Sequence, residues 1–166
     1  APFDACALMR DIAHAQQGVA AREGNRLALD LRDDSLARVT GDGNRVHQVL
    51  LNLVSNALKF TRDGQITLKA FRNAEGDAVF EVRDSGIGIA PEDMSRIFEE
   101  FVTLNTDYNR KAQGTGLGLA ISRRLATLMG GRLEAESAPG LGSVFRLIQP
   151  LPPAEPHLPA PALPQD

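Results

Sequence analysis

The feature that most constrains the fold is an apolar helical pattern, between positions 46 and 59, that polar residues interrupt. Its apolar positions recur at helical spacing and predict an amphipathic helix packed on a core: Val46, Leu50, Leu53, Val54 and Ala57. Asn52, Asn56 and Lys59 follow one another at spacings of four and three, which places them on one helix face. Asparagine is a mediocre helix former and is costly to bury without a partner. The stripe therefore indicates either side chains that cap loops or face solvent, or side chains that bind a ligand.

Helical and strand patterns alternate along the rest of the chain. Further helices are predicted from Phe3 to about Ala21, briefly from Pro91, and from near Leu117 to the glycines that follow Met129. Strands are predicted at 26–33, 65–71, 78–84, 132–138 and 142–149, several of them linked as hairpins. This mixture favours an α+β fold over a doubly wound parallel sheet. We expect a two-layer α/β sandwich, with a mixed, mostly antiparallel sheet covered on one face by helices.

The prolines indicate where the folded part ends. Seven of the ten prolines follow Gln149, which is typical of an extended segment without a core of its own. We expect residues 1–149 to form one domain and residues 150–166 to form a proline-rich linker or disordered tail. Such a tail is consistent with a further domain beyond it.

Composition excludes several classes of function. With 18 basic and 21 acidic residues the net charge is -3, so no overall positive field favours nucleic acid or an anionic membrane. The single cysteine, Cys6, cannot form an internal disulfide, and no Cys/His metal cluster is present in the sequence. No apolar run approaches the roughly 20 residues of a membrane span. We expect a cytoplasmic domain without direct membrane contact, the cytosolic portion of a protein that could itself be membrane-anchored.

A second polar feature lies where a predicted strand ends, in the segment 84–89 (Asp-Ser-Gly-Ile-Gly-Ile). Asp84 follows an apolar strand and offers only acceptor atoms, which suit the exocyclic amine of adenine and not the keto oxygen of guanine. Gly86 and Gly88 permit close backbone approach to a flat ligand. Alternatively, Asp84 is simply a turn-forming residue, which is the commoner role of a lone Asp-x-Gly-x-Gly.

A third segment, 114–119 (Gly-Thr-Gly-Leu-Gly-Leu), opens the last predicted helix. Unpaired amides at a helix start form a phosphate cradle when glycines leave them accessible. Alone, the pattern Gly-x-Gly-x-Gly is weak evidence for a phosphate site. It is not a dinucleotide fingerprint, which would need glycine at Leu119, and it is not a P-loop, which would need Gly-Lys-Ser/Thr.

Together and in this order, these segments resemble the conserved boxes of the GHKL ATPase superfamily. The likeness is greatest to the catalytic and ATP-binding domain of bacterial sensor histidine kinases. Four segments carry it: 52–60 as the asparagine box, 84–89 and 114–119 as the two glycine boxes, and 97–101 as the phenylalanine box. The resemblance extends from about residue 3 to the final predicted strand and implies a Bergerat-type ATP-binding fold, with ATP and Mg²⁺ as cofactors.

The resemblance also implies residue roles. Asn56 would be the Mg²⁺ ligand, and Asn52 and Lys59 would stand beside the phosphates. Asp84 would hold the adenine amine, with Gly86 and Gly88 beside the base. The second glycine box would meet the phosphates through its backbone: Gly114, Thr115, Gly116, Leu117, Gly118 and Leu119.

The stretch 102–113 would be the ATP lid of this family. Within it, Arg110 or Lys111 could reach the γ-phosphate and Tyr108 could touch the base; an ordinary solvated loop is the alternative for all three. Phe98 and Phe101 are interpreted as packing residues that anchor the lid.

Asn52 distinguishes transfer from hydrolysis within the superfamily. Hydrolases such as gyrase and MutL place a glutamate four residues before the magnesium asparagine, and Asn52 stands at that position. An amide cannot act as a general base. The resemblance therefore favours a protein-histidine kinase, with Asn52, Lys59 and Arg110 as catalytic residues. A GHKL ATPase or protein serine kinase, and a nucleotide-sensing module without transfer, remain open alternatives.

The phosphoacceptor histidine is expected on a separate domain. His14, His47 and His157 all lack the acidic residue and downstream proline of the family's phosphoacceptor box. The implied partners are a histidine-containing dimerisation/phosphoacceptor domain and a downstream response regulator or fused receiver domain. The resemblance thus implies a phosphorelay of the two-component system type, with a homodimeric full-length protein.

Overall fold

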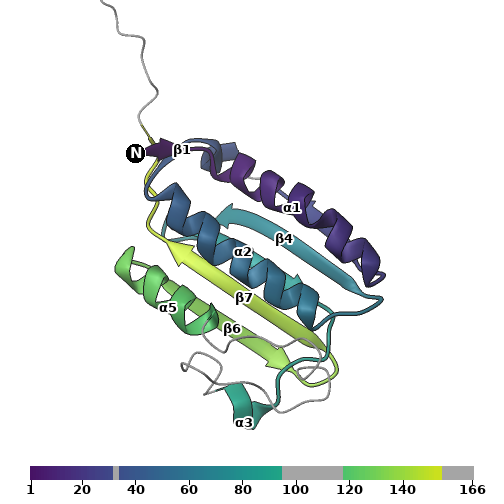
Figure 1. Ribbon diagram of the computed structural model, residues 1–166. Helices are drawn as coiled ribbons and strands as arrows, with labels where there is room; N and C mark the ends of the chain where they lie inside the picture. The colour runs from purple at the N-terminus through teal and green to yellow at the C-terminus, as the bar shows by residue number, and fades with distance from the viewer. Residues whose placement is uncertain (32–33, 95–117, 155–166) are drawn as a thin grey trace, which may run out of the picture.

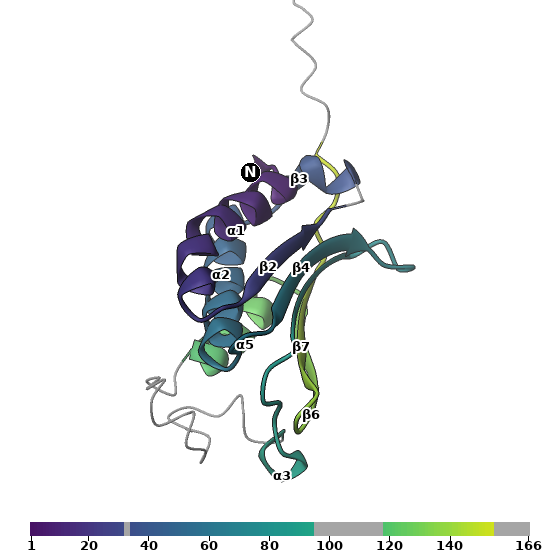
Figure 2. The same cartoon turned by 90° about the vertical axis from the view of Figure 1, so that its right-hand side faces the viewer.

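The computed structural model describes residues 1–31, 34–94 and 118–154, and its elements form two layers. The helices are α1 (Ala5–Arg22), η1 (Asp34–Ala37), α2 (Gly43–Lys59), α3 (Pro91–Met94) and α5 (Gly118–Leu128). The strands are β1 (Pro2–Phe3), β2 (Arg26–Asp30), β3 (Val39–Thr40), β4 (Gln65–Arg72), β5 (Ala78–Asp84), β6 (Arg132–Ala138) and β7 (Gly142–Gln149). In Figure 2 the helices α1, α2 and α5 cover one face of the sheet, and the opposite face carries none of the described helices.

The main sheet is mixed and mostly antiparallel, as predicted. Its strand order is β2-β4-β5-β7-β6, and the pairing of β2 with β4 is parallel while the other three pairings are antiparallel. The β4–β5 hairpin closes through Asn73, whose Oδ1 accepts a hydrogen bond from the Asp77 amide at 2.9 Å. A parallel β2–β4 pair requires a long crossover, and α2 lies within it.

Two aspartates start the long helices. Asp4 precedes α1 and its Oδ1 accepts from the Ala7 amide at 2.8 Å; Asp42 precedes α2 and accepts from the Arg45 amide at 3.1 Å. Such caps satisfy amides that have no partner within the helix. The first helix begins later than predicted because Phe3 belongs to β1, which pairs with β3.

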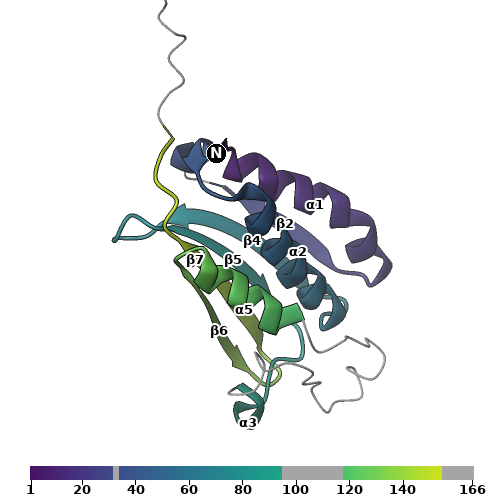
Figure 3. The ribbon, with the colours of Figure 1, turned by 60° about the vertical axis from the view of Figure 1, so that its left-hand side comes forward.

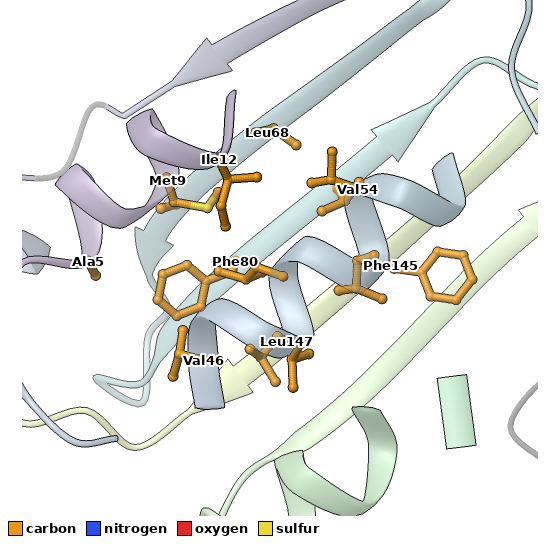
Figure 4. Packing of buried hydrophobic residues seen from close by; sticks show 14 of the residues in the cluster. Ala5, Met9, Ile12, Val46, Val54, Leu68, Phe80, Phe145 and Leu147 are labelled. Atoms are coloured by element: carbon orange, nitrogen blue, oxygen red, sulfur yellow. The ribbon is translucent and has the colours of Figure 1, made fainter. Parts of the chain in front are cut away.

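The core lies between α1, α2 and the inner face of the sheet (Figure 4). Phe80 of β5 and Leu147 of β7 are fully buried beneath α2, and the predicted apolar face of α2 is buried as well: Val46, Leu50, Leu53, Val54 and Ala57. Alternation along β5 turns Phe80 and Val82 inward and leaves Arg83 exposed. This burial fixes α2 across the middle of the sheet.

Packing continues past Gln149, where the sequence analysis placed the start of the linker. The Thr40 amide donates to the carbonyl of Pro152 at 2.8 Å, and the Ala154 amide donates to the carbonyl of Arg38 at 3.0 Å. Leu151 is 4% exposed and belongs to the core. Within the described residues, no helix has the length and apolar character that crossing a membrane requires.

Candidate nucleotide site

The polar face of α2 meets the start of α5. The two helices lie side by side over the sheet (Figure 3). Asn52 Nδ2 donates to Ser122 Oγ at 3.0 Å, and Ser122 is 2% exposed. A Cβ added to Gly118 would lie 2.6 Å from Asn52 Oδ1, so a side chain there would collide with the amide. The structure thus brings Asn52 together with the described end of the predicted phosphate cradle.

Asn56 and Lys59 follow Asn52 along α2. The Asn56 side chain is half-buried, and Lys59 is exposed as the last residue of the helix. No group of three or more His, Cys, Asp or Glu side chains that could hold a metal occurs within the described residues. The amide oxygen of a residue such as Asn56 is chemically suitable as a ligand for Mg²⁺, which prefers oxygen atoms and retains several waters.

Asp84 is the last residue of β5 and is 7% exposed. Its Oδ1 accepts a hydrogen bond from the Gly86 amide at 2.9 Å. Burial raises the pKa of the Asp84 carboxyl above its ordinary value, and the backbone amides of Gly86 and Ser143 oppose that shift. The result is a nearly buried acceptor at the end of the sheet.

Thr61 is a residue of this region that the sequence analysis missed. Its side chain is fully buried, and Oγ1 has no partner of good hydrogen-bond geometry among the described residues. The hydroxyl nevertheless lies close enough to Asp84 to lower the pKa of that carboxyl. The sequence pattern did not mark Thr61, because it lies just beyond the predicted helix. Its burial depends on Gly86, which the chain brings beside it after the β4–β5 hairpin.

The glycines at 86 and 88 have a structural role that the sequence did not reveal. A Cβ at Gly86 would collide with the carbonyl of Phe60, and a Cβ at Gly88 would collide with the carbonyl of Ala138. Gly88 also has a φ of +76°, a conformation that favours glycine. These glycines therefore allow the loop after β5 to pass between the end of α2 and the β6–β7 turn.

Several predicted site residues lie outside the described residues. These are Tyr108, Arg110, Lys111, Gly114, Thr115, Gly116 and Leu117, together with the packing residues Phe98 and Phe101. Of the second glycine box, Gly118 and Leu119 are described, and Leu119 packs half-buried against the core.

Comparison with known proteins assigns the family. Residues 41–153 match the family of histidine kinase-, DNA gyrase B- and HSP90-like ATPases, a stretch that includes Asn52, Asp84 and Gly118. The chain belongs to this ATPase family. This match, together with the similar proteins and structures, confirms the resemblance to sensor histidine kinases and the α+β sandwich.

The similar proteins include a sensor protein and a hybrid histidine kinase. The chain is 41% identical over 148 residues to the aerobic respiration control sensor protein ArcB of Escherichia coli, covering 88% of this chain and 19% of ArcB. It is 42% identical over 116 residues to hybrid signal transduction histidine kinase B of Dictyostelium discoideum, covering 68% of this chain and 6% of that protein. The crystal structure of full-length ShkA in complex with AMPPNP matches with a TM-score of 0.82 and 36% identity, covering 96% of this chain and 33% of ShkA.

Proposed function

We propose that this domain binds Mg-ATP and donates the γ-phosphoryl group to a histidine on a separate dimerisation/phosphoacceptor domain. The observation that carries the proposal is the contact of Asn52, on the polar face of α2, with Ser122 near the start of α5, in an ATPase-family fold that places the nearly buried Asp84 at the end of β5. The kinase relatives favour transfer to a protein histidine within two-component signal transduction.

Each end of the nucleotide has a proposed partner. Asp84 accepts from the adenine amine, with Gly86 and Gly88 at the edge of the base. Asn56 provides an amide oxygen to Mg²⁺, which neutralises phosphate charge when bound. Asn52 and Lys59 stand beside the phosphates.

The remaining proposed contacts come from the second glycine box and the lid. The backbone of that box forms the phosphate cradle: Gly114, Thr115, Gly116, Leu117, Gly118 and Leu119. In the lid, Arg110 and Lys111 reach the γ-phosphate and Tyr108 touches the base.

Transfer, rather than hydrolysis, follows from the amide at position 52. Asn52 cannot remove a proton from water, and its Nδ2 already donates to Ser122. The acceptor histidine brings its own nucleophile: its imidazole nitrogen bonds to the γ-phosphorus while the bond to the β–γ bridging oxygen breaks and ADP leaves. Positioning and charge neutralisation are sufficient for this chemistry.

The partners follow from the same proposal. The domain acts on a histidine-containing dimerisation domain and passes the phosphoryl group onward to a response regulator or a fused receiver domain, within a homodimeric, cytosolically facing protein. The Dictyostelium relative is a hybrid signal transduction histidine kinase, which supports a fused receiver.

The test mixes this chain with Mg-ATP labelled at the γ-phosphate and a candidate phosphoacceptor domain. We expect acid-labile, alkali-stable label on the acceptor histidine, and none when that histidine is replaced by glutamine. Steady ATP turnover by this chain alone would instead favour an ATPase. Binding of ATP with no label on any acceptor domain would favour a nucleotide-sensing module.

A further inference from the structure

The hydrogen bond between Asn52 and Ser122 joins residues that are 70 positions apart in the sequence. Ser122 lies one helical turn beyond Gly118 on α5, and its side chain is 2% exposed. A buried serine hydroxyl normally requires a partner, because an unsatisfied hydroxyl away from water costs free energy. The partner here is a side chain from the polar face of α2.

The same amide also contacts the first residue of α5. A Cβ built on Gly118 would lie 2.6 Å from Asn52 Oδ1 and 3.0 Å from Nδ2. The amide group is therefore held between the backbone of Gly118 and the hydroxyl of Ser122. Any rotation of the Asn52 side chain would break the hydrogen bond or displace the first turn of α5.

The hydrogen bond affects how α2 and α5 are placed relative to each other at the phosphate end of the proposed site. An amide has one acceptor oxygen and one donor nitrogen. With Nδ2 bonded to Ser122, the rotamer of Asn52 is tied to the position of α5 at this point. Asp84 lies at the end of β5 and takes no part in that contact.

We propose that Ser122 is a positioning residue for the phosphate end of the nucleotide site, acting through its hydrogen bond to Asn52. This inference rests on the proposed function, because it assumes that phosphates bind beside α2 and the start of α5. Ser122 itself touches no nucleotide. It holds the Asn52 amide and the first turn of α5 in the arrangement that Mg-triphosphate requires.

The experiment measures calorimetric affinity for Mg-AMPPNP and for adenosine, which has no phosphate. Ser122→Ala is expected to weaken Mg-AMPPNP binding roughly threefold to tenfold, the value of one net hydrogen bond, and to leave adenosine affinity unchanged. Thr127→Ala is the matched control, because Thr127 is exposed on the same helix and its hydroxyl bonds only locally, to the Arg123 carbonyl at 3.1 Å. We expect this control to match the wild-type chain with both ligands.

A double-mutant cycle with Asn52→Ala tests the route of the effect. If Ser122 acts through Asn52, Ser122→Ala causes no further loss in the Asn52→Ala background. Additive losses, unchanged Mg-AMPPNP affinity in Ser122→Ala, or an equal loss of adenosine affinity would overturn the positioning role. If the wild-type chain binds neither ligand, the proposed function fails, and this inference fails with it. Wild-type binding with an unaffected Ser122→Ala overturns the positioning role alone.

Discussion

Near Asp84, neighbouring backbone carbonyls leave no room for a side chain at positions 86 and 88, which are glycines. Between α2 and α5, by contrast, the two helices are joined by a side-chain hydrogen bond between Asn52 and Ser122. The first region is defined by backbone sterics and burial. The second is defined by polar side chains from two helices. A closely packed region suits a flat base of fixed shape, whereas a polar seam suits phosphate oxygens, among which charge shifts during transfer. The two regions should therefore respond differently to substitution.

The largest effect is expected where packing is tightest. Gly88→Ala should lower the free energy of unfolding by about 3 kcal/mol, because it adds left-handed backbone strain and a clash with the Ala138 carbonyl. Gly76→Ala is the matched control: Gly76 has a φ of +87° but nothing within 4 Å of its added Cβ, so only the strain of about 1 kcal/mol remains. Urea denaturation measures both, and equal losses would show that crowding at Gly88 is not important.

A charge change at Asp84 should separate binding from stability. Asp84→Asn is expected to weaken ATP binding by about 2 kcal/mol, roughly 30-fold, because a charged acceptor for the adenine amine is lost. Calorimetry with ATP measures this loss, with Asp77→Asn in the β4–β5 turn as the control.

The same substitution should raise the stability of the unliganded domain at neutral pH. Burial raises the folded-state pKa of Asp84, so its stability contribution is fully present below the unfolded-state pKa and is lost as pH rises through the folded-state pKa. At neutral pH the buried carboxylate is therefore a cost that asparagine removes. A less stable Asp84→Asn domain would mean that the hydrogen bonds to the carboxylate outweigh its desolvation.

At the α2 seam the expected loss is smaller and depends on the metal. Asn56→Ala should reduce affinity for ATP with Mg²⁺ on the order of tenfold, because one ligand oxygen is lost, and should change affinity for ATP with EDTA little. Titrations with and without Mg²⁺ measure the difference. An equal loss in both conditions would place Asn56 at the nucleotide rather than at the metal.

The smallest expected effect is a shift in the pH dependence of ATP affinity, through Asp84. ATP affinity should fall as pH drops through the raised pKa of Asp84, because the protonated carboxyl no longer offers a charged acceptor. Thr61→Val should move that fall to higher pH and weaken binding a few-fold near it, because the Thr61 hydroxyl lowers the pKa of Asp84. Thr61→Ser should keep the wild-type profile. Identical profiles for Val and wild type would show that the hydroxyl does not act on Asp84.

Much of the fold was predictable because its signals are local. The period of the apolar residues in α2 and the strand patterns of β4, β5, β6 and β7 gave elements close to those observed. The extent of packing was less predictable. A proline-rich composition predicts an extended segment, but Leu151 is buried in the core and the neighbouring Pro152 bonds to Thr40 of β3, which composition does not reveal.

The residues of the candidate site also fall into those that the sequence indicated and those that only the structure showed. The helical spacing of Asn52, Asn56 and Lys59 was sufficient to place them on one face, and the resemblance to histidine kinases indicated Asp84. The sequence pattern did not indicate Ser122 or Thr61. Their importance comes from neighbours distant in the sequence: Asn52 for one, and Asp84 with Gly86 for the other.

By itself the sequence determined the elements, the family and the polar stripe of α2, because period, motif and spacing are properties of neighbouring residues. Only the tertiary structure decided that the glycines after Asp84 are required by the chain's own carbonyls, that Thr61 is buried beside that carboxyl, and that Ser122 holds Asn52. Those features depend on which surfaces meet when α2, α5 and the sheet pack, and packing is decided by the burial of the whole core rather than by any one segment.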